Sequence, residues 1–187
     1  LLKQLLLQNL DGIEHCLIYC HDMDQLMTVA SLLIELGVSY QKITGEESNS
    51  PDPRFGGLTE RDWIIKQFAL GTTRVLLAIK CLDEGVDVPS AKMSYILASS
   101  GNPREFIQRR GRLLRPSPDK DFALINDFVV VPSLMEITAD NPEEVSDSNS
   151  TSILRKEVAR IEQLSRDALN ADQISEILKP YLKEDDN

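Results

Sequence analysis

The chain has 187 residues, of which 42% are hydrophobic and 27% are charged, close to the averages of globular proteins. This composition excludes a disordered chain or a disulfide scaffold, and no apolar run approaches the roughly 18 residues needed to span a bilayer. The net charge of −10 argues at first against a nucleic-acid partner, whose phosphates are normally met by Lys and Arg.

Apolar runs bounded by turn residues alternate with helical patterns, which is typical of successive strand–helix units and a mainly parallel sheet. The predicted strands cover residues 16–19, 38–43, 74–79, 93–98 and 122–126. Three helices are predicted between these strands. The first is capped by Asp22 or Asp24 and ends at Gly37, and its inward-facing residues are Leu26, Val29, Ala30, Leu33 and Leu36. The second begins at Thr59 and Glu60 and ends at Gly71, with Trp63, Ile64, Phe68 and Ala69 facing inward, and the third runs from Pro103 to Pro116.

The first predicted strand and the residues beside it contain His15, Cys16, Cys20 and His21, a set that could bind zinc. Because alternation along a strand would point these side chains to opposite faces, we predict no metal site. With Cys81 the chain has three cysteines, which cannot all pair, so we expect a reducing, cytoplasmic environment.

The ends of the chain carry less regular patterns. The chain opens inside an expected helix without an initiator methionine, so we expect a piece of a longer polypeptide. Residues 46–56, between Gly45 and Gly57, hold too many turn formers for regular structure and predict a mobile surface loop. Residues 140–151 have the composition of a linker.

Beyond that linker, apolar positions at helical spacing predict one or two amphipathic helices. These positions are Leu154, Val158, Ile161, Ala168, Leu169, Ile174, Ile177, Leu178 and Tyr181. The helices either pack on the flank of the main domain or dock on a partner. We therefore expect a main domain over residues 1–135, a linker over 136–151 and a helical extension over 152–187.

The run at residues 108–115 combines Gln108 with several arginines on a predicted helix. Arg112 and Arg115 are three residues apart and so neighbour each other on the helix, and guanidinium groups grip phosphate oxygens in a bidentate way. Residues 92–120 contain seven basic and two acidic residues, whereas the chain from residue 134 onward contains thirteen acidic and six basic residues. The negative net charge is therefore concentrated outside this run. This run predicts a phosphate or nucleotide ligand, and the alternative is a solvated, ion-paired helix end.

A second candidate site is the segment 82–89, directly after an apolar strand. In open parallel sheets, ligands collect at the carboxyl ends of strands, where an acidic side chain can accept a hydrogen bond from a ribose hydroxyl. Asp87 is the candidate for that contact, and Gly85 would let the backbone approach closely. The alternative is a capped turn without a ligand.

Together and in this order, these segments resemble the C-terminal RecA-like domain of superfamily-two helicases, from about residue 16 to residue 126. In this family the first strand is motif four, Gly45 and the stretch from Thr59 to Gly71 form an accessory part, 75–89 is motif five and 108–115 is motif six. The resemblance implies a three-layer α/β RecA-like fold with a mainly parallel sheet, extended here by C-terminal helices.

The arginine run is most similar to type III restriction-enzyme and DNA-repair helicases. Gln108 stands where the RNA-specific DEAD-box branch usually has histidine, which favours double-stranded DNA.

The resemblance also implies roles for single residues. Arg115 would be the arginine finger, Arg112 a second γ-phosphate contact, Gln108 a positioner of the phosphate or the attacking water, and Asp87, beside Gly85, the ribose contact. The positions matching nucleic-acid contacts are Tyr19, His21, Gly45, Arg61 and Lys80. Ile79 departs from the threonine that the family often has in motif five, and Lys80 is a substitute for its phosphate contact.

The chain contains no Gly-x-x-x-x-Gly-Lys-Ser/Thr phosphate loop, and Asp83 and Glu84 lie inside motif five, so we reject them as a magnesium site. We therefore expect ATP with Mg²⁺ to be held together with an N-terminal motor domain of the same polypeptide. The predicted function is the C-terminal half of an ATP-dependent helicase or translocase, inactive in isolation. The alternative is a non-catalytic, helicase-like module that binds nucleic acid or recruits a protein partner through its C-terminal helices.

Overall fold

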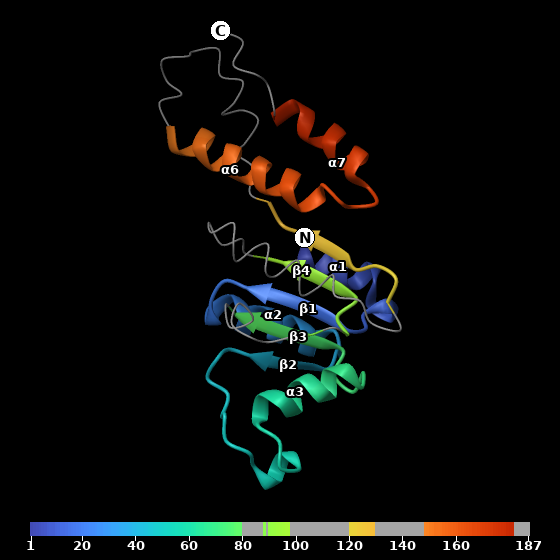
Figure 1. Ribbon diagram of the computed structural model, residues 1–187, viewed down its shortest axis with the longest axis vertical. Helices are drawn as coiled ribbons and strands as arrows, with labels where there is room; N and C mark the ends of the chain where they lie inside the picture. The colour runs from blue at the N-terminus through green and yellow to red at the C-terminus, as the bar shows by residue number, and fades with distance from the viewer. Residues whose placement is uncertain (80–87, 89, 98–119, 130–147, 182–187) are drawn as a thin grey trace. The chain divides into compact units, whose positions relative to one another are not determined.

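The computed structural model describes residues 1–79, 88, 90–97, 120–129 and 148–181 (Figure 1). The chain divides into two compact units, Leu1–Phe128 and Val129–Asn187, and each is described here by itself. None of the helices in the described ranges is long and apolar enough to cross a membrane.

Five strands form one sheet in the described part of the first unit, in the order β2-β3-β1-β4-β5. They are β1 (Cys16–Cys20), β2 (Tyr40–Ile43), β3 (Val75–Ile79), β4 (Met93–Ile96) and β5 (Leu124–Asp127). Every neighbouring pair is parallel. The prediction of an α/β, RecA-like fold with a mainly parallel sheet is therefore confirmed.

The parallel register brings the carboxyl ends of all five strands to one edge of the sheet, which we call the carboxyl edge (Figure 1). Cys20 pairs with Ile79, and Ile43 pairs with Ala78. Ile96 pairs with Asp127 on the other side of the central strand. Segments that leave the strands at this edge are neighbours in space although they are far apart in sequence.

The helix α2 (Met23–Glu35) covers one face of the sheet and lies behind it in Figure 1. Its buried residues are Leu26, Val29, Ala30 and Leu33, as predicted, and Leu36 is half-buried. They form one hydrophobic core with side chains from α1 (Leu2–Gln8), from the short η1 (Leu10–Gly12) region and from alternate positions of three strands. The strand positions in this core are Cys16, Ile18, Cys20, Val75, Leu77 and Tyr95.

The helix α3 (Glu60–Ala69) covers the opposite face. The chain moves two positions across the sheet from β1 to β2 and one position back to β3, and right-handed crossovers then place the two helices on opposite faces. Ile64 and Phe68 are buried, outside the α2 core, and Trp63 is half-buried. The prediction that Ala69 points inward is wrong, because Ala69 is exposed: it lies one position past Phe68, about 100° around the helix.

The second unit contains α6 (Ser148–Ser165), α7 (Ala171–Leu178) and η4 (Lys179–Tyr181). Val158, Ser165 and Leu178 are buried in it, whereas Leu169 and Ile177 are 96% and 66% exposed. The helix α6 begins at Ser148, within the residues whose composition predicts a linker. Serine and asparagine disfavour helix interiors but are common at helix starts, so composition alone misplaced this boundary.

Candidate functional site

The carboxyl edge holds the candidate site, and four of the predicted site residues lie in the described part of it or beside it: Tyr19, His21, Gly45 and Arg61. The other six, Lys80, Gly85, Asp87, Gln108, Arg112 and Arg115, lie outside the described residues. The strands that precede them do reach this edge. β3 ends at Ile79, one residue before Lys80, and β4 ends at Ile96, ahead of the arginine run.

The connection from β1 to α2 is short and closed by mutual hydrogen bonds. Asp22 caps α2, and its Oδ1 accepts a hydrogen bond from the backbone N–H of Gln25 at 2.8 Å. The Gln25 side chain in turn accepts a hydrogen bond from the backbone N–H of His21 at 2.7 Å. This reciprocal arrangement pairs the Gln25 amide of the first helical turn and the His21 amide that precedes the helix, and it leaves the exposed His21 at the carboxyl edge.

Tyr19 lies on β1 and is only 2% exposed, so its ring is not at the surface in this structure. Cys16 and Cys20 are also buried, and both lie in the α2 core on the same face of the sheet. Their side chains therefore do not point to opposite faces, as the strand argument had assumed for the whole set. Burial raises the pKa of each thiol to about 12, for Cys20 with a smaller contribution from the negative charge of Asp22.

The neutral thiols are poor metal ligands, because cysteine binds metals as a thiolate. Among the residues that the structure describes, no group of three or more His, Cys, Asp or Glu side chains is placed to hold a metal ion.

The connection from β2 to α3 begins with a compact turn around a carboxylate. Oε1 of Glu47 accepts hydrogen bonds from the backbone N–H of Thr44 at 2.6 Å and from the Thr44 hydroxyl at 3.0 Å. Oε2 of Glu47 accepts a hydrogen bond from the backbone N–H of Gly45 at 3.0 Å. Gly45 has a φ of 91°, a conformation that glycine adopts readily and other residues rarely do. Two consecutive amides and one hydroxyl thus converge on a single negatively charged group.

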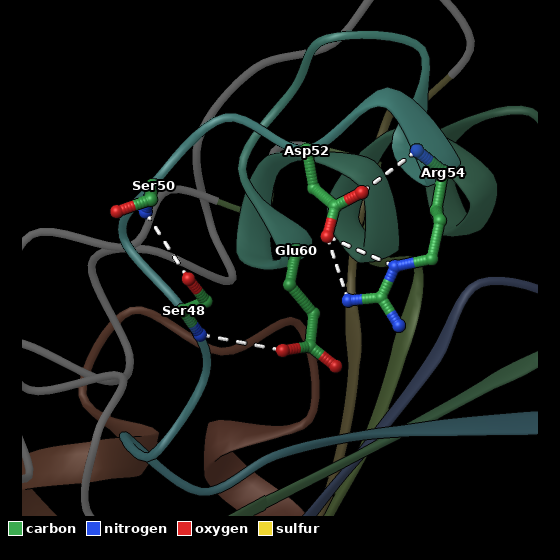
Figure 2. A network of polar contacts seen from close by, with 5 residues as sticks. All are labelled: Ser48, Ser50, Asp52, Arg54 and Glu60. Atoms are coloured by element: carbon green, nitrogen blue, oxygen red, sulfur yellow. Dashed lines mark hydrogen bonds and ion pairs between the residues drawn. The ribbon is translucent and has the colours of Figure 1, made fainter.

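The rest of this connection is also held by acceptor side chains (Figure 2). The backbone N–H of Ser48 donates to Glu60 at 3.3 Å, and the backbone N–H of Ser50 donates to the Ser48 hydroxyl at 3.2 Å. Asp52 accepts from the backbone N–H of Arg54 at 2.8 Å and from its guanidinium at 2.9 and 2.6 Å. The arginine lowers the pKa of Asp52, first through its side-chain hydrogen bonds and then through its backbone N–H.

The prediction of a surface loop over residues 46–56 is confirmed, because most of these residues are exposed, but the prediction that they lack regular structure is wrong. They contain the 3-10 helix η2 (Pro53–Phe55), and Asp52 and Leu58 form an isolated antiparallel bridge. Pro53 supplies a fixed φ at the start of the 3-10 turn, and the glycines Gly56 and Gly57, with φ of 67° and 82°, let the chain turn back. The Phe55 ring packs on Trp63 of α3 at a centroid distance of 5.3 Å, and the guanidinium of Arg54 lies 5.6 Å from the Phe55 ring centroid.

Arg61 lies in the first turn of α3 and is half-buried. Thr59 and Asp62, on either side of Arg61 in sequence, cap this helix: the Thr59 hydroxyl accepts a hydrogen bond from the backbone N–H of Asp62 at 3.1 Å and donates one to the Asp62 carboxylate at 2.8 Å. Because α3 follows β2 through a loop at the carboxyl edge, its first turn lies toward that edge (Figure 1).

His21 and Gly45 thus lie on connections that leave one edge of the sheet, and Arg61 lies in the first turn of the helix that follows the second connection. The strands β1 and β2 are separated by β3 alone, so the starts of their two connections are about 10 Å apart at the usual strand spacing. Sequence reasoning missed Thr44 and Glu47. The sequence offers one weak signal, an acidic residue two positions after a glycine that is separated from a predicted strand by Thr44 alone.

Comparison with known proteins is consistent with this geometry. Residues 1–117 match the family model of the helicase conserved C-terminal domain. Over 66 residues the chain is 44% identical to the DNA 3'-5' translocase XPB2 of Sulfurisphaera tokodaii, a match that covers 35% of this chain and 15% of that protein. Over 115 residues it is 28% identical to the ATP-dependent RNA helicase DBP8 of Kluyveromyces lactis, covering 60% and 26% of the two chains.

Two solved structures share the fold. The C-terminal part of the Fun30 ATPase domain superposes with a TM-score of 0.59 at 19% identity, covering 88% of this chain and 53% of that one. The Hef helicase domain of Pyrococcus furiosus gives a TM-score of 0.51 at 20% identity, covering 73% and 26%. The matches to the two curated relatives above span about a quarter of their length or less. Because the family model covers more than half of the residues, the chain belongs to the helicase conserved C-terminal domain family of superfamily-two helicases.

Proposed function

We propose that this chain is the C-terminal motor half of an ATP-dependent helicase or translocase that moves along double-stranded DNA. The observation that carries the proposal is the shared carboxyl edge of β3 and β4, because both candidate nucleotide-binding segments belong to the connections that follow these strands in sequence. Segment 82–89 begins three positions after the end of β3, and the arginine run begins twelve positions after the end of β4. In open parallel sheets, ligands bind outside the carboxyl ends of the strands. One nucleotide at this edge could therefore be reached from both segments.

The catalytic part of the proposal rests on the resemblance to the family. Arg115 is the arginine finger, Arg112 a second γ-phosphate contact and Gln108 the positioner of the phosphate or the attacking water. Asp87 holds the ribose, and Gly85 lets the backbone approach it. An arginine finger neutralises charge that grows in the transition state and contributes roughly a thousandfold or more to the rate of phosphoryl transfer.

The chain supplies half of such a site. It has no Gly-x-x-x-x-Gly-Lys-Ser/Thr phosphate loop, so we propose that the N-terminal motor domain of the same polypeptide holds the β- and γ-phosphates of ATP and the Mg²⁺ ion. The bound metal would stabilise negative charge on the phosphate oxygens. The residues of this chain would complete the pocket from the opposite side.

The nucleic-acid track follows the same edge. His21 and Gly45 leave β1 and β2 there, Arg61 lies in the first turn of α3, and Lys80 follows β3. Tyr19 is buried one residue before the end of β1, and in the proposal it supports the strand end from which His21 emerges. Such contacts to the phosphate backbone position a strand without reading its sequence. Gln108 favours DNA over RNA, and with the arginine run it is typical of type III restriction-enzyme and DNA-repair helicases.

The test compares ATP hydrolysis by the 187-residue chain with hydrolysis by the polypeptide that carries the upstream motor domain. We expect negligible turnover from the chain alone and DNA-stimulated turnover from the longer protein. Arg115→Ala in the longer protein should lower kcat by roughly a thousandfold, whereas Arg109→Ala, in the same run, serves as the matched control. Robust turnover by the 187 residues alone, or near-normal turnover by the Arg115 variant, would contradict the proposal.

A second function is favoured by the surface of the second unit. Leu169 and Ile177 are large apolar side chains that are mostly exposed there, in a part of the chain where acids outnumber bases. A non-catalytic helicase-like module that binds nucleic acid, or recruits a protein partner through α6 and α7, would account for this surface. The same experiment separates the two functions, because such a module gives no DNA-stimulated hydrolysis in the longer protein.

A further inference from the structure

The turn at Thr44 and Gly45 has the chemistry of an anion-binding site. Consecutive backbone N–H groups that converge near a positive-φ residue form a concavity that binds anions such as phosphate. Here the two amides and the Thr44 hydroxyl point at one negatively charged group, at distances between 2.6 and 3.0 Å. The turn directly follows β2 and therefore lies at the carboxyl edge of the sheet.

The anion in this turn is supplied by the chain itself. Glu47 uses both carboxylate oxygens, one for Thr44 and the other for Gly45. A carboxylate and a phosphate present the same kind of oxygen acceptors to backbone amides, and both form charge-assisted hydrogen bonds with them. The Glu47 carboxylate thus stands where a phosphate of a bound strand would stand.

We propose that Glu47 is an internal competitor of nucleic acid: its carboxylate occupies the phosphate-binding turn at Thr44 and Gly45 and is displaced when a backbone phosphate binds. The inference rests on the proposed function, in which Gly45 belongs to the nucleic-acid track. It gives Glu47 a role that the resemblance to the family does not supply. The turn then has two states: Glu47 occupies it in the absence of nucleic acid, and a backbone phosphate occupies it when nucleic acid is bound.

The surrounding contacts allow such a displacement. The Ser48 N–H is held by Glu60 on α3, and the Asp52–Arg54 pair closes the next part of the loop, so neither contact depends on Glu47 (Figure 2). The Glu47 side chain is half-buried on a loop whose neighbouring residues are exposed. It can therefore leave the turn without dismantling the loop.

The consequence is a lower affinity for the nucleic-acid strand. A phosphate must break the charge-assisted hydrogen bonds of Glu47 before it can form its own, so the measured affinity falls by the strength of the internal contact. Hydrogen bonds to charged groups are individually strong enough that removing the competitor should raise the affinity roughly tenfold. A motor that releases one phosphate for the next at each step would use such a contact to speed release.

The test measures binding of a fluorescein-labelled DNA duplex to the 187-residue chain by fluorescence anisotropy. Glu47→Ala vacates the turn, and Glu46→Ala is the matched control, because it removes the same charge from the adjacent, exposed residue. We expect Glu47→Ala to bind roughly tenfold more tightly than Glu46→Ala. Thr44→Val, which removes the hydroxyl donor, should reduce that gain when combined with Glu47→Ala. Far-UV circular dichroism verifies that each variant is folded.

A second measurement addresses the turn without nucleic acid. In ¹⁵N-labelled protein, inorganic phosphate should shift the amide resonance of Gly45 saturably in Glu47→Ala, and the unaltered chain should need roughly tenfold more phosphate for the same shift. Equal DNA affinities of the two alanine variants, or weaker binding by Glu47→Ala, would overturn the inference while leaving the proposed function intact. If no variant bound DNA, the proposed function would fail, and the phosphate titration would still decide whether the turn is an anion site blocked by Glu47.

Discussion

Two connections leave the same edge of the sheet and perform the same structural task, yet they are built differently. The first passes from β1 to α2 through His21 and Asp22: Asp22 accepts a hydrogen bond from the Gln25 amide, and the Gln25 side chain accepts one from the His21 amide. The second runs from Thr44 to Thr59 before α3 begins, and carboxylates hold it along its length. The short connection ends at the Asp22 cap of α2. In the long connection, backbone N–H groups of the loop donate to side-chain carboxylates, which a ligand with similar oxygen acceptors could replace.

In our proposal, one sheet supports a fixed connection and, beside it, a connection whose carboxylate is exchanged for a phosphate. A helix cap belongs to the helix, and its loss weakens the secondary structure itself. A carboxylate on a loop pairs with a few amides, and its loss changes the loop while the sheet and helices remain. Changes to the core, the short connection and the long connection should therefore give effects of decreasing size.

The largest effect is expected from the core that supports both connections. Leu77 is fully buried on β3, between β1 and β2, and Leu77→Ala should lower the free energy of unfolding by about 3 kcal/mol through lost burial and a cavity. The measurement is urea unfolding followed by circular dichroism and by the fluorescence of Trp63. Both signals should shift to lower urea together, because both connections rest on the same strands.

The control is Leu70→Ala, the same substitution at a residue that is 67% exposed. Its effect should stay within about 0.5 kcal/mol, as is usual for surface positions. Equal losses from the two variants would show that β3 does not support the sheet in the way described. A shift in the circular dichroism signal alone would show that the long connection unfolds independently of the core.

The same contrast explains which features could be predicted from sequence. The strands β1 and β3 are apolar at every position because both faces are covered, so their runs were unambiguous. The start of β2 was misplaced at Val38. The Val38 N–H instead donates to the carbonyl oxygen of Leu33, as part of the turn through Gly37 that follows the end of α2. Phe122 was assigned to β5 for its hydrophobicity, but it is 70% exposed and the strand begins at Leu124.

The site was harder to predict because its contacts depend on turn geometry rather than on periodicity. Gly45 was singled out by the resemblance to superfamily-two helicases, but the sequence alone does not show that Glu47 turns back onto it. Likewise, the pairing of the Ser48 amide with Glu60 joins residues that are twelve positions apart and meet only once the loop has folded. The helix caps Asp22 and Thr59, by contrast, were predictable because capping is local.

A smaller effect is expected from the short connection. Asp22→Ala removes the acceptor of the Gln25 amide and should cost about 1 kcal/mol of unfolding free energy, the usual value for a helix cap. Urea unfolding measures the loss, and the native fluorescence of Trp63 should stay unchanged because the long connection is untouched. Asp24→Ala, in the first turn of the same helix, removes the same charge but no cap, and an equal cost from it would refute the capping role.

The smallest effect is expected from the long connection, and it depends on pH. Asp52 has a lowered pKa in the folded chain, chiefly because Arg54 donates hydrogen bonds to its carboxylate. A lowered pKa means that the folded turn favours the ionised form. Its contribution is therefore present above the ordinary aspartate pKa of about 3.9 and is lost as the pH falls through the lower value of the folded chain.

Trp63 can report this loss because it is the chain's one tryptophan and packs on Phe55, next to Arg54. On acidification below about pH 4, its fluorescence should change in the unaltered chain as the Asp52–Arg54 contact weakens. Asp52→Asn keeps the shape without the charge, so it should show the altered fluorescence already at pH 7 and no transition of this origin at low pH. Circular dichroism at each pH separates this local change from unfolding of the sheet. An identical acid transition in both proteins would mean that the turn is held by its backbone bonds and that its carboxylate is dispensable.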